Sequence, residues 1–388
     1  MRAAVNQVVA TTRDSGPLWA GSLILDRLLP YPVLRMWPPV QVGAEDLKRQ
    51  LLAILRAWGM SQEHSDVTAS HMVETDLRGV HSHGSGMLRH YHRALLAGAI
   101  TPTPTIAASA RDGSTATVDG GGGLGHVPAR AAMELAIEIS RETGIGAVAV
   151  RNSGHFGAAG NYALMAAEAD CVGIVMSDTL LPAVVPTHGA APMLGTNPIA
   201  FAAPASSNDP FVLDMATTTA SHGKIVTAWR RGRRIPSGWA IDARGRPVRN
   251  ARKAAEGRRL TPLGSSPSLG SYKGYGLAAA VEILSTLLAG RGGAPGLGHE
   301  KPRVGHFMLA LDPARFRPAG EFGRDLDALI DSLRAARPLD PRRPVRVPGD
   351  PERAAASVGA REGMPMSRSV IEDIRAVARA SGVPFELA

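Results

Sequence analysis

TATVDGGGGLG, residues 115–125, and RNSGHFGAAG, residues 151–160, are glycine-rich segments that each connect an apolar strand to a helical pattern. The helical pattern after the first segment runs to about residue 140, and the buried strand GIGAVAV, residues 144–150, leads into the second. A further helix to residue 169 and the strand VGIVM, residues 172–176, repeat the order. Strands and helices that alternate in this way predict an α/β fold.

The loop GGGGLG, residues 120–125, fits the G-x-G-x-x-G pattern of Rossmann dinucleotide sites. Such a site for NAD needs an acidic side chain about 20 residues further on, at the end of the next strand. That strand ends here in Arg151 and Asn152. Because an arginine can hold the 2'-phosphate of NADP, a Rossmann site stays open, although four consecutive glycines match the pattern easily.

His155 lies between a buried strand and the start of a helix, among residues small enough for a ligand to approach the backbone. Amides at a helix start attract phosphate. A neutral imidazole, with an ordinary pKa near 6.5, can take a proton from a substrate hydroxyl. The alternative is a structural histidine that caps a turn.

Other candidates also follow regular elements. A helix expected from Asp66 to Arg78 leads into a loop with His81, Ser82 and His83. Asp214 ends the apolar strand FVLDM, residues 211–215, and three threonines follow at 217–219. Carboxyl ends of strands are common places for ligand contacts in α/β sheets.

Lysine is rare in this chain, with five residues, and two of them, Lys224 and Lys273, lie in glycine-flanked motifs. A lysine at a helix start, as predicted for Lys273, opposes the helix dipole unless an anion lies nearby. The alternative is an exposed loop lysine. A metal site at His81, His83, His90 and His92 is a further hypothesis, although the Cys partners or the HExxH helix of specific zinc motifs are missing.

Composition limits the classes of function. The chain has 388 residues, 44% of them hydrophobic, enough for a sizeable core and about two to three structural units. Aromatic residues make up only 4%, too few for nucleic-acid stacking platforms. The net charge is +9, and we interpret the basic residues as scattered through the chain. The one local run, at residues 230–234, is interpreted as a solvated turn. We therefore expect no nucleic-acid partner.

A reducing, cytoplasmic location is expected. The single cysteine, Cys171, cannot form an internal disulfide. The apolar run at residues 18–34 is interrupted by charges and prolines and is too short to span a bilayer, so we expect no membrane partner. Residues 1–39 are predicted to be an N-terminal extension, in which the first 35 could precede a start at Met36.

The remaining elements follow from periodicity. Expected are strands at 199–203 and 306–311, a turn-rich polar region at 229–270, and helices around 47–55, 277–288, 326–333 and 371–378. Ser369 and Glu372 are spaced as a capping box for the last helix.

Six motifs in order carry a family resemblance. They are DLRGVHSHG (76–84), RNSGHFGAAG (151–160), GTNPIAFAAP (195–204), VLDMAT (212–217), HGK (222–224) and YKGYGL (272–277). Together they resemble the malate/L-lactate dehydrogenase family, with ureidoglycolate and sulfolactate dehydrogenases and a cyclic-imine reductase, from about residue 40 to the C-terminus.

The resemblance implies a non-Rossmann NAD(P)-binding α/β fold with a mixed sheet, in which GGGGLG is a structural turn. It also implies a helical domain at 40–115, completed by 320–388, an α/β domain for cofactor and substrate at 116–319, and a homodimer.

The resemblance also implies roles for particular residues. His155 matches the acid/base, while Ser82 and His83 match a pair with that role in the imine-reductase branch. Tyr91 and Arg89 are expected to bind substrate. Cofactor contacts carry over to His155, Phe156, Gly157, Ala158, Ala159, Ser177, Asp214, Met215, Ala216 and Lys273.

Two positions depart from the family pattern. Many members have an arginine four residues after the SHG histidine, where this chain has Met87, with Arg89 displaced by two. Many members also have asparagine at the position of Asp178, whereas the ureidoglycolate branch resembles this chain in having Ser-Asp there.

We therefore expect an oxidoreductase that transfers a hydride between NAD or NADP and a small 2-hydroxy or 2-oxo acid, without a metal. The alternatives are an NADPH-dependent cyclic-imine reductase of the same family and a metal-dependent hydrolase.

Overall fold

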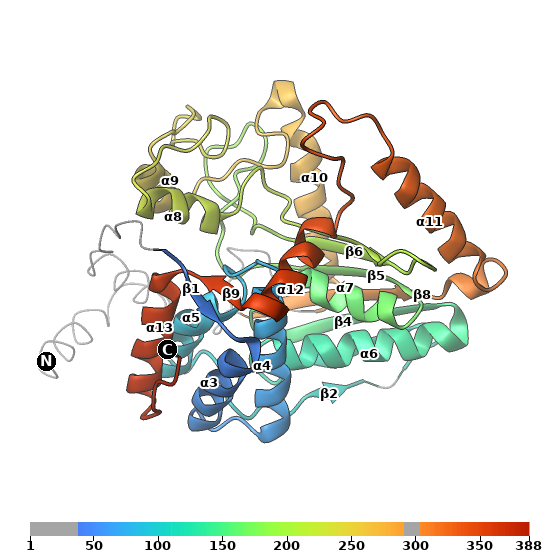
Figure 1. Cartoon of the computed structure of the whole chain (residues 1–388), viewed down its shortest axis with the longest axis horizontal. Helices are drawn as coiled ribbons and strands as arrows, with labels where there is room; N and C mark the ends of the chain where they lie inside the picture. The colour runs from blue at the N-terminus through green and yellow to red at the C-terminus, as the bar shows by residue number, and fades with distance from the viewer. Residues whose placement is uncertain (1–37, 110, 291–302, 388) are drawn as a thin grey trace, which may run out of the picture.

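The computed structural model describes residues 38–109, 111–290 and 303–387, arranged around one central sheet (Figure 1). The predicted N-terminal extension lies outside these residues, except for Pro38 and Pro39. None of the helices in the described ranges is long and apolar enough to cross a membrane.

The central sheet has seven strands in the order β2-β3-β4-β8-β5-β6-β7. Their bounds are β2 (Ala107–Ala108), β3 (Thr115–Asp119), β4 (Ile145–Ser153), β5 (Val172–Ser177), β6 (Ile199–Ala203), β7 (Phe211–Met215) and β8 (Val304–Leu311). Only β3 and β4 pair in parallel, and every other neighbouring pair is antiparallel. The predicted mixed sheet is therefore confirmed.

The parallel pair is the unit that the first glycine segment predicts. The chain leaves β3 through residues 120–125, forms α6 (His126–Thr143) and returns through β4. Gly144 ends α6 in the left-handed conformation, with φ of 89°, which glycine adopts without a Cβ penalty. Both β4 and the inner side of α6 are apolar, so the helix buries its face on the sheet.

Helices cover both faces of the sheet (Figure 1). On one face, α6 and α7 (Ala159–Glu168) pack side by side over the main core. On the other face lie α10 (Ser271–Glu282) and its π-helical continuation η3 (Ile283–Leu287), which touches β8, β4 and β5. Gly305 of β8 permits this approach, because a Cβ at that position would overlap the Ser285 carbonyl oxygen.

A second core belongs to a helical part built from both ends of the described chain. It contains α3 (Ala44–Ala57), α4 (Gln62–Leu77), α5 (Leu88–Leu96) and α13 (Arg368–Ala380). The short strands β1 (Val40–Val42) and β9 (Met364–Met366) pair antiparallel and join the two ends. Leu47, Leu51, Ile54 and Leu55 lie on the buried face of α3, at the predicted helical spacing.

Several predicted boundaries change. The helix expected from Asp66 begins at Gln62, because the Ser61 side chain accepts a hydrogen bond from the His64 N–H. The last helix is capped by Ser367, which accepts from the Val370 N–H, so the capping box predicted at Ser369 and Glu372 is wrong.

Other helices begin earlier than expected or were missed. The helix expected at 277–288 begins at Ser271, which puts Lys273 in its first turn. Within the turn-rich region, α8 (His222–Arg230) extends into residues 229–230 and α9 (Ala251–Gly257) forms a short helix.

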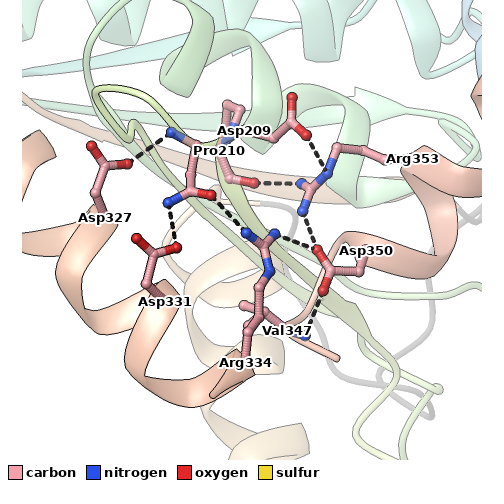
Figure 2. A network of polar contacts seen from close by, with 9 residues as sticks. Asp209, Pro210, Asp327, Asp331, Arg334, Val347, Asp350 and Arg353 are labelled. Atoms are coloured by element: carbon pink, nitrogen blue, oxygen red, sulfur yellow. Dashed lines mark hydrogen bonds and ion pairs between the residues drawn. The ribbon is translucent and has the colours of Figure 1, made fainter. Parts of the chain in front are cut away.

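The C-terminal helices α11 (Glu321–Arg334) and α12 (Asp350–Glu362) are tied to the turn between β6 and β7 by a polar network (Figure 2). The Asp350 carboxylate accepts from Arg334 at 2.8 Å, from Arg353 at 2.6 Å and from the Val347 N–H at 2.8 Å. Arg353 also donates to the Pro210 carbonyl oxygen at 2.7 Å. Burial pushes the pKa of Asp350 upward, but these donors hold it at about 2.

Candidate functional site

The two glycine-rich segments pack directly against each other. The N–H groups of Gly120, Gly122 and Gly125 donate to the carbonyl oxygens of Arg151, Asn152 and His155 at 2.9, 2.8 and 3.1 Å. A Cβ on Gly125 would overlap the Gly154 carbonyl oxygen and lie 2.8 Å from Phe156 Cβ. The glycines of GGGGLG therefore allow close backbone contact that holds the His155 loop, as expected of a structural turn.

His155 makes its described polar contacts through one ring nitrogen. The hydroxyl of Tyr91 lies 2.7 Å from Nδ1, and the Gly157 N–H donates to the same atom at 3.3 Å. Because a backbone N–H can only donate, Nδ1 acts as an acceptor and the neutral ring carries its proton on Nε2. Burial lowers the pKa of His155 well below 6.5, and the nearby His83 lowers it further.

Ser82 and His83 lie beside His155. The rings of His83 and His155 stack with centroids 5.7 Å apart, and the Ser82 hydroxyl lies 2.9 Å from Nδ1 of His83. Both histidines are half-buried, and Ser82 is exposed, so solvent reaches this group of side chains. Burial lowers the pKa of His83 below 6.5. The structure thus brings together the three predicted catalytic residues from two distant motifs.

Asp76, which the sequence analysis quoted in a motif but gave no role, holds this loop. Asp76 is 1% exposed, and its carboxylate accepts from the Ser85 N–H at 2.8 Å and lies 3.0 Å from Nδ1 of His81. A Cβ on Gly84 would lie 2.5 Å from the Asp76 Oδ1 atom. A carboxylate in the last turn of a helix is unfavourable with the helix dipole. This unfavourable position was the feature of the sequence from which a role for Asp76 could have been inferred.

Two further histidines, the buried His126 and the partly buried His71, lie behind His155 and were not singled out from the sequence. His126, at the start of α6, is fully buried, and neither of its ring nitrogens has a described hydrogen-bond partner. Tyr91 meets His126 edge to face at 5.6 Å, and His71 stacks on Tyr162 at 4.6 Å. Burial lowers the pKa of His71 to about 4 and that of His126 to about 3, so both are neutral at pH 7.

Ser177 and Phe156, both predicted to contact the cofactor, are linked through His306. His306 is fully buried in β8 and lies 2.9 Å from the Ser177 hydroxyl and 2.8 Å from that of Ser153. Its ring stacks on Phe156 with centroids 4.4 Å apart. This histidine ties the ends of β4, β5 and β8 to the His155 loop. No sequence motif points to His306, because Ser153 and Ser177 are more than a hundred residues away in the chain.

Asp214 and Gly160 join two other predicted segments. The Gly160 N–H, in the first turn of α7, donates to the Asp214 carboxylate at 2.8 Å. The amide of Gly160 is therefore already occupied, so this one amide of the helix start is not open to phosphate. Surrounding protein raises the pKa of Asp214 to about 6, although the residue stays open to solvent and the Gly160 bond opposes the rise.

Neighbours of these residues complete the predicted cofactor set. Gly157 has φ of 82°, and a Cβ there would lie 3.3 Å from the His83 carbonyl oxygen. Ala158 and Ala159 are buried, while Met215 and Ala216 are partly buried after Asp214.

Lys273 lies in the first turn of α10, a helix start with no side-chain cap. Its ammonium group lies 5.9 Å from the Tyr272 ring centroid. A helix N-terminus without a capping side chain, together with a lysine, is a donor set that suits phosphate. The Leu263 N–H donates to the Thr217 carbonyl oxygen at 3.0 Å, so the loop before α10 lies beside the segment after Asp214. This part of the chain fits the phosphate groups of a dinucleotide.

Arg89 and Tyr91, the predicted substrate contacts, have protein partners. Arg89 forms an ion pair with Asp373 of α13 at 2.6 Å. Tyr91 is 1% exposed, and burial raises its pKa above 10, so its hydroxyl stays protonated. Met87, at the position of the family arginine, packs partly buried against the helical core.

Histidines of the metal hypothesis have separate neighbours. His81 contacts Asp76, and His92 stacks on Trp58 at 5.6 Å. His90 lies 6.1 Å from the ring centroid of Tyr91. In the described ranges, no three His, Cys, Asp or Glu side chains come together as metal ligands would.

Comparison with known proteins agrees with the motifs. A family model described as malate/L-lactate dehydrogenase matches residues 42–375. Malate dehydrogenase from Pyrococcus abyssi is 37% identical over 348 residues, which is 89% of this chain and 96% of that protein. L-sulfolactate dehydrogenase from Methanocaldococcus jannaschii is 35% identical over 88% of this chain and 97% of that protein.

Solved structures share the fold. Malate dehydrogenase from Pyrococcus horikoshii matches with a TM-score of 0.81 and 33% identity, covering 91% of this chain and 99% of that one. Delta1-piperideine-2-carboxylate reductase from Pseudomonas syringae matches with a TM-score of 0.75 and 27% identity, covering 87% and 100%.

Proposed function

The chain belongs to the malate/L-lactate dehydrogenase family and is a hydroxy acid dehydrogenase, and we propose that it uses NAD or NADP with His155 as the acid/base. The observation that carries this proposal is the contact of Tyr91, His155 and His83 at one solvent-reachable place.

His155 supplies a ring that can exchange a proton with the oxygen on C2 of the acid. In oxidation, the neutral ring accepts the hydroxyl proton; in reduction of a 2-oxo acid, the protonated ring returns it. The low pKa of His155 makes its protonated form a strong acid. A bound substrate carboxylate beside the ring favours the protonated form and raises that pKa again.

Tyr91 and Ser82 orient the two histidines. The Tyr91 hydroxyl fixes the His155 ring through Nδ1, and the Ser82 hydroxyl fixes the His83 ring in the same way. In the neutral form that these contacts favour, Nε2 of His155 donates. Acceptance of a substrate proton at Nε2 requires the other tautomer, in which Nδ1–H donates to the Tyr91 oxygen. Rotation of the Tyr91 hydroxyl lets its oxygen accept from Nδ1–H, and the 3.3 Å hydrogen bond from the Gly157 N–H to Nδ1 must then break.

The cofactor would lie along the segments that meet beside His155. Lys273 and the start of α10 would hold its phosphate groups, and Asp214 would accept hydrogen bonds from its hydroxyls. A bound nicotinamide would supply the hydride chemistry, which is the exchange of a hydride with C2 of the acid. Phe156 and Ser177, both held by His306, would border it.

A cation is needed for the substrate carboxylate. Arg89 is the proposed residue, but its ion pair with Asp373 must then be exchanged for the substrate. Such a partly exposed pair contributes little, about 0–1 kcal/mol, so an anionic substrate can compete with Asp373.

The family homodimer is supported by an apolar surface. Large hydrophobic side chains of α10, η3 and the turn after η3 are exposed: Tyr272, Tyr275, Ile283, Leu287 and Leu288. Exposed apolar patches of this kind are typical of interfaces. Light scattering coupled to size exclusion tests the dimer, and Leu287→Lys with Leu288→Lys should shift it to a monomer.

Reduced-nicotinamide absorbance tests the function. Purified protein is given NAD or NADP and a panel of malate, lactate, sulfolactate and ureidoglycolate, each with and without a chelator. Turnover of at least one acid that survives the chelator supports the proposal and identifies the cofactor. Silence with every acid and both cofactors contradicts it.

A cyclic-imine reductase is the second candidate, favoured by the Ser82–His83 hydrogen bond. The same assay with a cyclic imine carboxylate and reduced nicotinamide distinguishes it. Turnover of the imine together with silence on all four acids would assign the chain to that branch.

A further inference from the structure

The excess positive charge of this chain lies in one segment. Residues 224–259 hold 12 of the 43 Lys and Arg residues but only 2 of the 34 Asp and Glu residues, a net charge of +10. All other residues together hold 31 basic and 32 acidic side chains, a net charge of −1. The interpretation of the basic residues as scattered is therefore wrong. We call residues 224–259 the basic lobe.

The basic lobe folds around a small core of its own, made by α8, α9 and neighbouring loops (Figure 1). Ile225, Ile235 and, at its edge, Leu260 are fully buried in this core, while the basic side chains lie outside it. Exposed basic residues of the lobe are Lys224, Arg231, Arg233, Arg234, Arg244, Arg246, Arg249, Arg252 and Lys253.

Little of this charge is neutralised inside the lobe. Asp242 pairs with Arg246 at 2.8 Å, and Glu256 pairs with Arg252 at 2.9 Å. Both acidic residues of the lobe are thus used. Within the described ranges, no ion pair reaches the arginines at 231, 233 and 234.

Part of the basic surface is concave. A hollow of about 550 Å³ is lined by Arg246, Arg249, Lys253 and Arg259, with Asp242 as its one acidic residue. Charges of one sign around a concave surface focus the electric field and raise the local concentration of ions of the opposite sign.

The lobe borders the proposed site. Helix α8 begins at His222, and a methyl group on Gly223 would lie 3.5 Å from Ser82 Cβ. The N-terminus of α8, which carries the positive end of the helix dipole, therefore abuts the Ser82–His83 loop. Lys224 is exposed in that first turn.

We propose that the basic lobe attracts the anionic acid substrate electrostatically and so raises its rate of encounter with the site beside Ser82. This inference rests on the proposed function, because it takes the ligand to be a carboxylate. Such acids are ionised at neutral pH, since carboxyl groups titrate near pH 4. Focused charge can raise association rates by about 10- to 1,000-fold, and salt screens the effect.

Charge removal at the lobe tests the proposal. The test variant is Arg231→Gln/Arg233→Gln/Arg234→Gln, just past the end of α8. The matched control is Arg337→Gln/Arg343→Gln/Arg346→Gln, which removes the same charge from exposed positions between α11 and α12. Both sets lie outside the residues assigned to catalysis or binding.

The measurement is kcat/KM for the acid found active in the panel, at ionic strengths from about 0.01 to about 0.15 M, over which the Debye length shortens from about 30 to about 8 Å. For the unmodified protein we expect a fall of about tenfold, the low end of the range for charge steering. For the lobe variant, kcat/KM at the lowest ionic strength should be about tenfold lower than for the unmodified protein and should change little with salt, while kcat stays the same. The control should follow the unmodified protein.

A second readout does not need turnover. Trp229 and Trp239 lie partly buried in the lobe, so iodide, an anion, should quench tryptophan fluorescence more than neutral acrylamide does at low salt. The ratio of iodide to acrylamide quenching should fall in the lobe variant and not in the control.

The outcomes separate the two proposals. An active enzyme whose kcat/KM ignores salt, or responds equally in both variants, overturns steering alone. Unchanged iodide quenching in the lobe variant overturns it as well. Retention of the protein on immobilised DNA that only the lobe variant loses, with kcat/KM unaffected, would assign the lobe to a polyanion instead. Silence on every acid contradicts the proposed function, and steering with it.

Discussion

The Tyr91 hydroxyl lies 2.7 Å from Nδ1 of His155, although the two residues are 64 positions apart in the chain. Tyr91 comes from α5 of the helical part, and His155 comes from the loop after β4. The proposed acid/base is therefore oriented by a residue from the other core. Because Tyr91 is buried, it acts on the substrate through His155 and is a positioning residue.

Tyr91→Phe should lower kcat about 5- to 30-fold and leave KM nearly unchanged, since it removes one hydrogen bond worth about 1–2 kcal/mol from the His155 ring. Steady-state kinetics measure both constants. Tyr275→Phe, at an exposed position on α10, is the control. A raised KM with normal kcat would instead mean that Tyr91 binds substrate directly.

His155→Ala should lower kcat by at least about a hundredfold, the usual scale for a positioned acid/base. Cofactor binding, followed by fluorescence of the reduced nicotinamide, should be largely kept. His83→Ala, which removes the ring stacked on His155, is the comparison. If His83→Ala lowers kcat more than His155→Ala does, the acid/base is His83.

The pH profile of kcat/KM follows from the lowered pKa of His155. Oxidation needs the neutral ring, so its rate should stay flat from pH 8 to pH 6.5 and decline only as the pH falls through the pKa of His155, below 6.5. Reduction needs the protonated ring and should rise over the same acidic range. An oxidation profile whose acidic midpoint lies at or above about 6.5 would contradict this assignment.

Gly125→Ala should destabilise the protein by about 1–3 kcal/mol, because the new Cβ would overlap the Gly154 carbonyl oxygen and force the His155 loop apart. It should also lower kcat. Gly276→Ala is a matched control, since a Cβ there would meet open space on a helix. Urea unfolding measures the stability, and steady-state kinetics measure kcat. If Gly125→Ala and Gly276→Ala gave the same stability and the same kcat, close contact between the two glycine-rich loops would not be required.

Asp350→Asn should lower the free energy of unfolding at pH 7 by about 1–2 kcal/mol, less than the full pKa shift gives because Asp350 and Arg334 are partly exposed. The folded pKa, about 2, lies below the ordinary value of 3.8. The carboxylate therefore stabilises the fold above pH 3.8, and this contribution is lost as the pH falls toward 2.

Urea unfolding at pH 7 and at low pH tests this sign. The difference between the unmodified protein and Asp350→Asn should shrink as the pH falls. Asp325→Asn removes an exposed partner of Arg317 and should leave the free energy of unfolding nearly unchanged. A difference for Asp350→Asn that persists unchanged at low pH would argue against the ion pairs as its source.

The sequence by itself determined the family, the mixed α/β fold and the loops in which the candidate residues lie. Glycine, histidine and small residues at fixed spacing carry that information, because a loop between a strand and a helix is a local feature. The periodicity of Leu47, Leu51 and Ile54 likewise located α3. The sequence did not fix the first residue of each helix. Ser61 and Ser367 are the N-caps, but other serines nearby have the same side chain and could cap in the same way.

Only the tertiary structure decided which of these side chains contact one another. It joined Tyr91 to His155 and Gly160 to Asp214, and it enclosed His306 between Ser177 and Ser153. These partners come from different strands and helices, so no local pattern links them. Burial also shifted the pKa of His155, because the cost of a charge depends on the atoms that fold around it. The charge of residues 224–259 was countable in the sequence, but its position beside Ser82 was set by folding alone.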